Sequence, residues 1–343
     1  MRVRARVRTY AYITLINFIG VFTMYMFKYV MKRIGLMLMT FLIIMVISFV
    51  LIKLLPFEPP VSMDDSSNIL KLQFEARGYY DPIMVQLWNY VKRIVLDWDW
   101  GIGVTMAAHR NAPVWDRFVE LLPPTILLNV YSSLFAVPIG LLLGIYAALR
   151  KNKWQDHAIS TGVMVFISVP VYITAFLLQY FLCHRWGLLP LTMDSGYDYF
   201  SWSMFKSMLP AVLAMSFGSI AGYCRFTRAE LTEVLTSEYL LLARTKGLTK
   251  RQSIFRHALR NAMVPIFPMI IGEFLSVLSG SLIIEGVFGI PGVGGLFLDS
   301  VSAQDYDFFM LLSAFYTFIG LAAGILIDIS YGFIDPRIRM GAK

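Results

Sequence analysis

The chain has 343 residues, of which 57% are hydrophobic and 15% are charged, and its mean hydropathy is +0.64. Soluble domains carry roughly 25% charged residues, so this composition excludes an ordinary soluble protein. The formal net charge is +8. We interpret it as positive charge retained on the cytoplasmic side of a membrane, and we expect no nucleic-acid partner. The two cysteines are too few for a disulfide scaffold and match no metal-binding spacing.

Six apolar runs approach or exceed the length of about 20 residues that a helix needs to cross a bilayer. They cover residues 34–55, 121–149, 158–183, 209–223, 263–284 and 308–333. The sequence therefore predicts an all-α, polytopic membrane protein with six transmembrane helices. We divide the chain into an N-terminal extension at 1–30, a first span with a long external loop at 31–120, and a core of five spans at 121–343.

Lysines and arginines predict the orientation of these spans. Basic residues precede the first span, follow the second span and end the chain. The loop at 225–262 holds eight basic residues against three acids, whereas the stretch 285–307 has four acids and neither lysine nor arginine. Both termini and the loop at 225–262 are therefore expected in the cytoplasm. The stretch 285–307 is expected outside, with Glu285 at the membrane interface.

Two segments outside the spans have a distinct pattern of charged and apolar residues. Residues 10–27 are uncharged, with basic residues on both sides. They are consistent with an interfacial helix, with an extra membrane segment, or with a native start at Met26 or Met31. In the external loop, residues 82–98 form an amphipathic pattern with tryptophans. This pattern predicts a helix that lies on the membrane surface, or on the outer face of the protein.

The basic loop at 225–262 contains the signals of a helical hairpin. Thr249 is followed three residues later by Gln252, which is the capping-box pattern at the start of a helix. Gly247, just before it, can end the preceding helix in a left-handed conformation. An apolar stripe follows, made of Leu248, Ile254, Phe255, Ala258 and Leu259. The stripe can pack against the protein's own helix ends, or it can dock into a groove on a soluble partner.

The segment "EYLLLARTKGLTKRQSIFRHALRNAMVP" resembles the cytoplasmic signature loop of ABC importer permeases, in particular the oligopeptide, dipeptide and nickel branch. Motifs in the family's order surround it: "LIKLLPFEPP", "GYYDPIMVQLWNYV", "DWDWGIGV", "APVWDRFVELLPPTILLNV", "EGVFGIPGVGGLFLDSVSAQDYDFFM" and "DPRIR". The resemblance covers nearly the whole chain after Met26 and points to the first, B-type permease of a peptide importer. The sequence departs from the family in "PFEP", where "PGDP" is usual, and in the signature's "EAA", which is reduced to Ala243.

This resemblance implies a transporter that pairs the chain with a second homologous permease, two ABC ATPase subunits and an extracytoplasmic substrate-binding protein. The chain itself has no GxxxxGK[ST] phosphate-binding loop, so ATP and magnesium would be used by the ATPase subunits and the chain would not be an enzyme. The resemblance places ATPase coupling on the hairpin, and the residues implied are Glu238, Tyr239, Ala243, Lys246, Gly247, Leu248, Ile254, Phe255, Arg256 and His257. The implied location is a bacterial or archaeal cytoplasmic membrane, in contact with lipid.

Two acids inside the spans, Glu273 and Asp328, are candidates for the translocation path, because an ionisable group in hydrocarbon is costly to keep. A structural hydrogen bond to a neighbouring helix explains Glu273 equally well. The four histidines show no HExxH pattern and no paired metal spacing, so no metal site is expected. A peptide is the favoured substrate. The alternatives are a permease for nickel or another small solute, and an ATP-independent secondary transporter.

Overall fold

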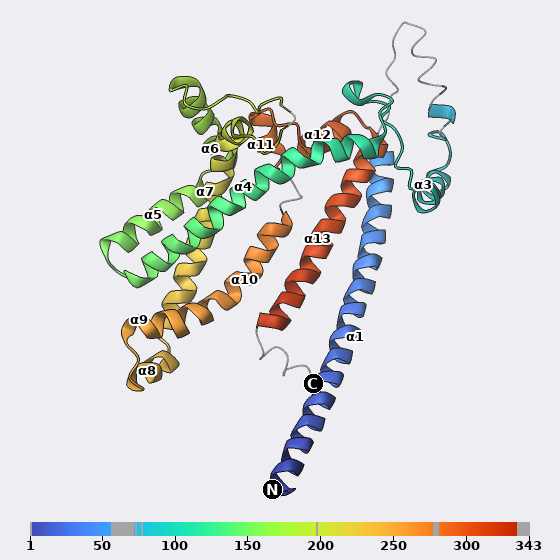
Figure 1. Ribbon diagram of the computed structural model, residues 1–343. Helices are drawn as coiled ribbons and strands as arrows, with labels where there is room; N and C mark the ends of the chain where they lie inside the picture. The colour runs from blue at the N-terminus through green and yellow to red at the C-terminus, as the bar shows by residue number, and fades with distance from the viewer. Residues whose placement is uncertain are drawn as a thin grey trace.

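The computed structural model describes residues 2–55, 72, 74–76, 78–196, 198–276 and 281–334 (Figure 1). Within these ranges the chain is helical and contains no strand beyond one isolated bridge between Ile102 and Pro113. The α-helices are α1 (Arg2–Leu54), α3 (Ile83–Asp97), α4 (Val114–Leu149), α5 (Trp154–Ser168), α6 (Val171–Leu178), α7 (Trp202–Leu235), α8 (Glu238–Thr245), α9 (Lys250–Ser253), α10 (Leu259–Ser276), α11 (Leu282–Val287), α12 (Val293–Ser302) and α13 (Tyr306–Ile334). The predicted all-α class is confirmed.

Five stretches are long and apolar enough to cross a membrane: Lys28–Leu54, Val114–Leu149, Trp202–Leu235, Lys250–Leu275 and Tyr306–Ser330. The predicted third span is a broken pair, Trp154–Ser168 and Val171–Arg185, bent by 99°. The break falls at Pro170, which precedes the first residue of α6, because proline lacks the N–H group that would continue the helix. Counted as one span, this pair makes the sixth.

Helices α4 and α7 pack along each other and form the centre of the molecule (Figure 1). Small residues on α4 allow this approach: a Cβ atom added at Gly140 or Gly144 would lie 2.6 Å from a side chain of α7. Next to this contact, Leu128 of α4 and Met208 of α7 belong to a buried cluster with Phe288 at the end of α11. The α4–α7 pair is thus the scaffold to which the shorter helices attach.

Helix α1 is a single helix of 53 residues, so the N-terminal extension continues directly into the first span. It contacts α13 and α3 and stands at the periphery of the molecule (Figure 1). The segment that spans the membrane is almost entirely exposed in the isolated chain, as expected of a helix that faces lipid or another subunit. On α13, Asp328 forms an ion pair of 2.9 Å with Arg33 of α1.

At the opposite end from α8 and α9, the helices α3, α11 and α12 form a layer with the 98–113 loop (Figure 1). Three acids of the stretch 285–307 are buried, and Glu285, which the sequence places at the membrane interface, lies inside the protein with only 1% of its surface exposed. The carboxylate of Glu285 accepts hydrogen bonds from Thr125 Oγ1 of α4 and from the backbone N–H of Gly294 in α12. The carboxylate of Asp305 accepts them from the N–H groups of Val104, Thr105 and Met106.

Candidate functional site

The helical hairpin lies at the end of the molecule away from α3 and α12, and it connects α7 with α10 (Figure 1). Helix α7 continues twelve residues beyond the predicted end of the fourth span, to Leu235, and α8 begins at Glu238. Beyond the turn, Lys250–Leu275 is one stretch that includes α9, a π-helical turn over Ile254–Ala258 and α10. The second arm of the hairpin is therefore the beginning of the fifth span, and not the separate short helix that the sequence predicts.

The turn between α8 and α9 has the predicted geometry. Gly247 has a φ of +93°, a conformation that residues with a side chain rarely adopt. Its N–H bonds to the carbonyl of Arg244 and the N–H of Leu248 bonds to that of Ala243, which is the Schellman pattern at a helix end. The capping box is also present, because Thr249 and Gln252 each accept a hydrogen bond from the other's backbone N–H. Local sequence thus fixes this turn.

The hairpin has an inward apolar face that attaches it to the scaffold. Leu240 of α8 and Ala258 of the π-helical turn are buried in one cluster with Leu231 of α7 and Ala148 of α4. Ile254 is buried as well. Burial of a side chain of this size stabilises a fold by about 1.5–3 kcal/mol. These contacts hold α8 and the start of α10 against the ends of α4 and α7.

The hairpin also has a second apolar face that is exposed among the residues that the structure describes. Its members are Tyr239, Leu241 and Leu242 of α8 and Phe255 of the π-helical turn, and Leu241 and Phe255 are 64% and 60% exposed. Large apolar side chains that cluster on an exposed surface are typical of an interaction site. The predicted stripe is therefore divided, because Ile254 and Ala258 pack inward and Phe255 points outward.

Most of the predicted coupling residues line the accessible side of the hairpin. The exposed ones are Glu238, Tyr239, Lys246, Gly247, Phe255, Arg256 and His257; Ala243 and Leu248 are half-buried, and Ile254 is buried. Sequence reasoning missed Leu241 and Leu242, although the run of three leucines at 240–242 was a usable signal. One leucine of such a run can face the scaffold while its neighbours face outward.

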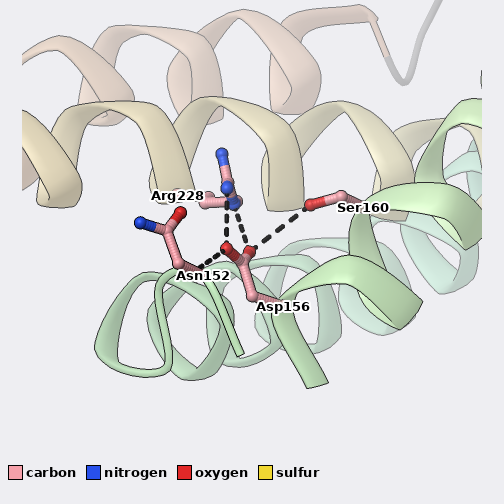
Figure 2. A network of polar contacts seen from close by, with 4 residues as sticks. All are labelled: Asn152, Asp156, Ser160 and Arg228. Carbon is pink, nitrogen blue, oxygen red and sulfur yellow. Dashed lines mark hydrogen bonds and ion pairs between the residues drawn. The ribbon is translucent and has the colours of Figure 1, made fainter. Parts of the chain in front are cut away.

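A polar network joins the scaffold near the hairpin and was not predicted (Figure 2). Asp156, in the first turn of α5, is fully buried and pairs with Arg228 of α7 through two contacts, of 2.5 and 2.8 Å. The same carboxylate accepts a bond from the backbone N–H of Asn152 and one from Ser160 Oγ. Charge-assisted bidentate pairs of arginine and carboxylate fix the relative orientation of the two side chains as well as their distance. They tie α5 to the part of α7 that leads into α8.

The two candidates for the translocation path lie apart and have partners. Glu273 of α10 is half-buried and accepts a 3.0 Å hydrogen bond from Ser219 Oγ of α7. Close by, the Tyr223 hydroxyl donates to the carbonyl of Met269. Asp328, in contrast, faces α1 through its ion pair with Arg33. Glu273 thus belongs to the α7–α10 contact, and Asp328 to the attachment of α1.

Comparison with known proteins identifies the family. Residues 140–340 match the model described as binding-protein-dependent transport system inner membrane component, and residues 26–129 match the model of its N-terminal part. The chain is 33% identical over 321 residues to the dipeptide transport system permease protein DppB of Bacillus subtilis, which covers 93% of this chain and all of that protein.

Two further relatives agree with this match. The DppB protein of Lactococcus lactis is 31% identical over 318 residues, covering 92% of this chain and 100% of that protein. The glutathione transport system permease protein GsiC of Salmonella choleraesuis is 32% identical over 317 residues, covering 92% of this chain and 99% of that protein. The resemblance to permeases of peptide ABC importers is confirmed, and a secondary transporter is set aside. The chain belongs to the family of inner membrane components of binding-protein-dependent transport systems.

Proposed function

We propose that this chain is one permease subunit of an ATP-driven importer of short peptides. The observation that supports this most directly is the family match along nearly the whole chain to relatives named for dipeptide and glutathione transport. In this proposal the chain forms half of the translocation pathway, and a second homologous permease forms the other half. A substrate-binding protein delivers the peptide from outside a bacterial or archaeal cytoplasmic membrane, and both termini of the chain are cytoplasmic.

The exposed apolar face of the hairpin is proposed as the docking surface for one of two ABC ATPase subunits. The inward face, with Leu240 and Ala258, holds the hairpin on α4 and α7. Phe255 and Leu241 on the opposite face would enter a groove of the partner, since an amphipathic helix is recognised through its apolar anchors. Because the second arm of the hairpin continues into α10, a displacement of the docked hairpin would move a membrane span directly.

Uptake measurements test the substrate. Cells that lack this chain are compared with cells in which it is restored, using a labelled dipeptide, glutathione and radioactive nickel in separate assays. We expect peptide uptake to disappear and return with the chain. If nickel uptake alone follows the chain, the peptide assignment is overturned while the permease assignment stands.

The docking surface is tested with Phe255→Asp, and Phe255→Leu serves as the matched control that keeps an apolar side chain. An anchor residue at an interface contributes about 2 kcal/mol or more, so Phe255→Asp should reduce peptide uptake and co-purification of the ATPase by more than about tenfold. The amount of the chain in the membrane should remain unchanged, because Phe255 is exposed. Normal ATPase co-purification with Phe255→Asp would contradict the docking proposal.

A further inference from the structure

A cavity is lined by residues of α1, α3 and α13. The ends of these helices that meet there lie far from the hairpin (Figure 1). The volume of the cavity is about 250 Å³. The charged groups that line it are Lys53 of α1, Arg93 of α3 and Asp307 of α13, so the lining carries one more positive than negative charge. The proposed transport function uses none of these groups. Such a lining favours a small anionic group as a ligand.

The ammonium group of Lys53 is held by aromatic rings. Its Nζ lies 3.6 Å from the ring centroid of Tyr306 and 3.9 Å from that of Tyr79. Cation–π contacts of this kind orient an ammonium group, and two ring faces occupy at most two of its three N–H groups. Across the residues that the structure describes, Lys53 has no hydrogen-bond acceptor and no ion-pair partner within 4.0 Å. The cavity thus contains an oriented cation with an unused donor.

The wall formed by α3 adds two further donors. Arg93 binds Asp307 through one guanidinium nitrogen at 2.8 Å. Its Nε makes no hydrogen bond to a described residue and lies 3.8 Å from the exposed Asp99. Tyr90 is only 9% exposed, and its hydroxyl has no hydrogen-bond partner among the described residues. A buried hydroxyl without a partner is costly. An oxyanion in the cavity would satisfy Tyr90 and Lys53 together.

The surroundings of the cavity identify where its ligand comes from. Along α3, Met84, Trp88, Val91 and Val95 form an exposed apolar stripe at helical spacing, and Trp88 is 69% exposed. An amphipathic helix with such a stripe lies in the membrane interface, at the depth of the lipid headgroups. Helix α1, the opposite wall, is at the periphery of the molecule and exposes apolar residues along its length. The cavity is therefore bordered by lipid-facing surfaces.

We propose that this cavity binds the phosphate of an anionic phospholipid, with Lys53 and Tyr90 as donors and the acyl chains along the exposed face of α1. The excess positive charge selects an anionic lipid over a zwitterionic one. The bound lipid would join α1 to α3 and α13, which α1 contacts in the larger described interfaces. The site is independent of the peptide substrate and of the ATPase partners.

The proposal is tested by native mass spectrometry of the full chain purified in detergent. The chain is titrated with phosphatidylglycerol and, separately, with phosphatidylcholine. We expect one tightly retained phosphatidylglycerol per chain. Lys53→Gln should lower the affinity for this lipid about five- to tenfold, because one Lys near a membrane surface raises the affinity for anionic lipid about fivefold, and by more where it is shielded from water. Lys53→Arg should retain binding. Lys92→Gln, an exposed lysine on the neighbouring helix α3, should also retain binding and is the matched control.

Tyr90→Phe separates ligand binding from folding. It removes a hydroxyl that has no hydrogen-bond partner among the described residues but keeps the ring. Thermal stability in lipid-free detergent should therefore not fall, while affinity for phosphatidylglycerol should fall about threefold. Equal affinity in the wild type, Lys53→Gln and Tyr90→Phe would overturn the site. So would equal losses in Lys53→Gln and Lys92→Gln, which would mean non-specific attraction. Competition by glycerol 3-phosphate at the lipid's own concentration would overturn the lipid assignment in favour of a free phosphate ester.

Discussion

Thr125 is the residue at which three helices meet. Its hydroxyl donates to Glu285 of α11 and accepts the backbone N–H of Val293 at the start of α12, both at 2.9 Å. The other oxygen of Glu285 accepts the N–H of Gly294 at 2.9 Å, and burial raises the pKa of this carboxyl group above its usual value. Two side chains thus hold the α11–α12 turn on α4.

Thr125→Val should lower the stability of the chain. Valine has nearly the same shape, but it leaves the buried N–H of Val293 and one lone pair of Glu285 without partners. A buried group left unsatisfied costs about 1–3 kcal/mol. The midpoint of thermal unfolding in detergent should therefore fall, while Thr125→Ser, which keeps the hydroxyl, should unfold close to the wild type. An unchanged midpoint in Thr125→Val would mean that this junction does not limit stability.

Single residues mark the limit of what the sequence could predict. The acids of the 285–307 stretch were visible as an external segment without lysine or arginine. The burial of these acids could not be predicted from the sequence, because the N–H groups that Asp305 binds belong to residues about 200 positions earlier in the chain. The same holds for Asp156, whose partner Arg228 is 72 positions away. Pairs of this kind exist only once the helices have packed.

At the scale of elements, the turn of the hairpin is set by local sequence and was predictable. Which of the hairpin's residues face the scaffold and which face outward was not predictable. Gly247 and the capping box of Thr249 act within a few residues and hold as predicted. Which of Ile254 and Phe255 points inward depends on the position of α4 and α7. Likewise, the apolar run of the fourth span ends near residue 223, but α7 continues to Leu235, and Arg228 in this continuation has a buried partner.

Gly247→Ala tests the hairpin as an element. At a φ of +93° a Cβ atom costs about 1–2 kcal/mol, which the short helices α8 and α9 can avoid by opening the turn. We expect peptide uptake to fall several-fold while the amount of folded chain in the membrane stays constant. Gly320→Ala is the control, because Gly320 lies inside α13 with ordinary φ and open space at its Cβ position. Full uptake by Gly247→Ala would show that coupling tolerates a different turn.

For the molecule as a whole, the attachment of α1 is the feature that depends on few neighbouring helices. Among the larger described interfaces α1 contacts only α13 and α3, and near its end away from the hairpin Phe49 packs in a buried cluster with Tyr90 of α3 and Met310 of α13. Toward the hairpin end of α1, its link is the pair of Arg33 and Asp328, which is half-exposed in the isolated chain. A membrane screens such a pair less than water does. Breaking the pair there would leave two isolated charges, which are costly in hydrocarbon.

Exchange of the two charges separates the structural role of Asp328 from a role in the translocation path. Arg33→Asp and Asp328→Arg each place two like charges together, so each should reduce the amount of monodisperse chain recovered by size-exclusion chromatography. The double variant restores an opposite pair between α1 and α13 and should restore the yield. Peptide uptake then decides: recovery together with the yield means that Asp328 serves only to hold α1. A double variant that is well folded but does not transport would support a role for Asp328 in the translocation path. In that variant the ion pair between α1 and α13 is kept, and only the carboxylate at position 328 is lost.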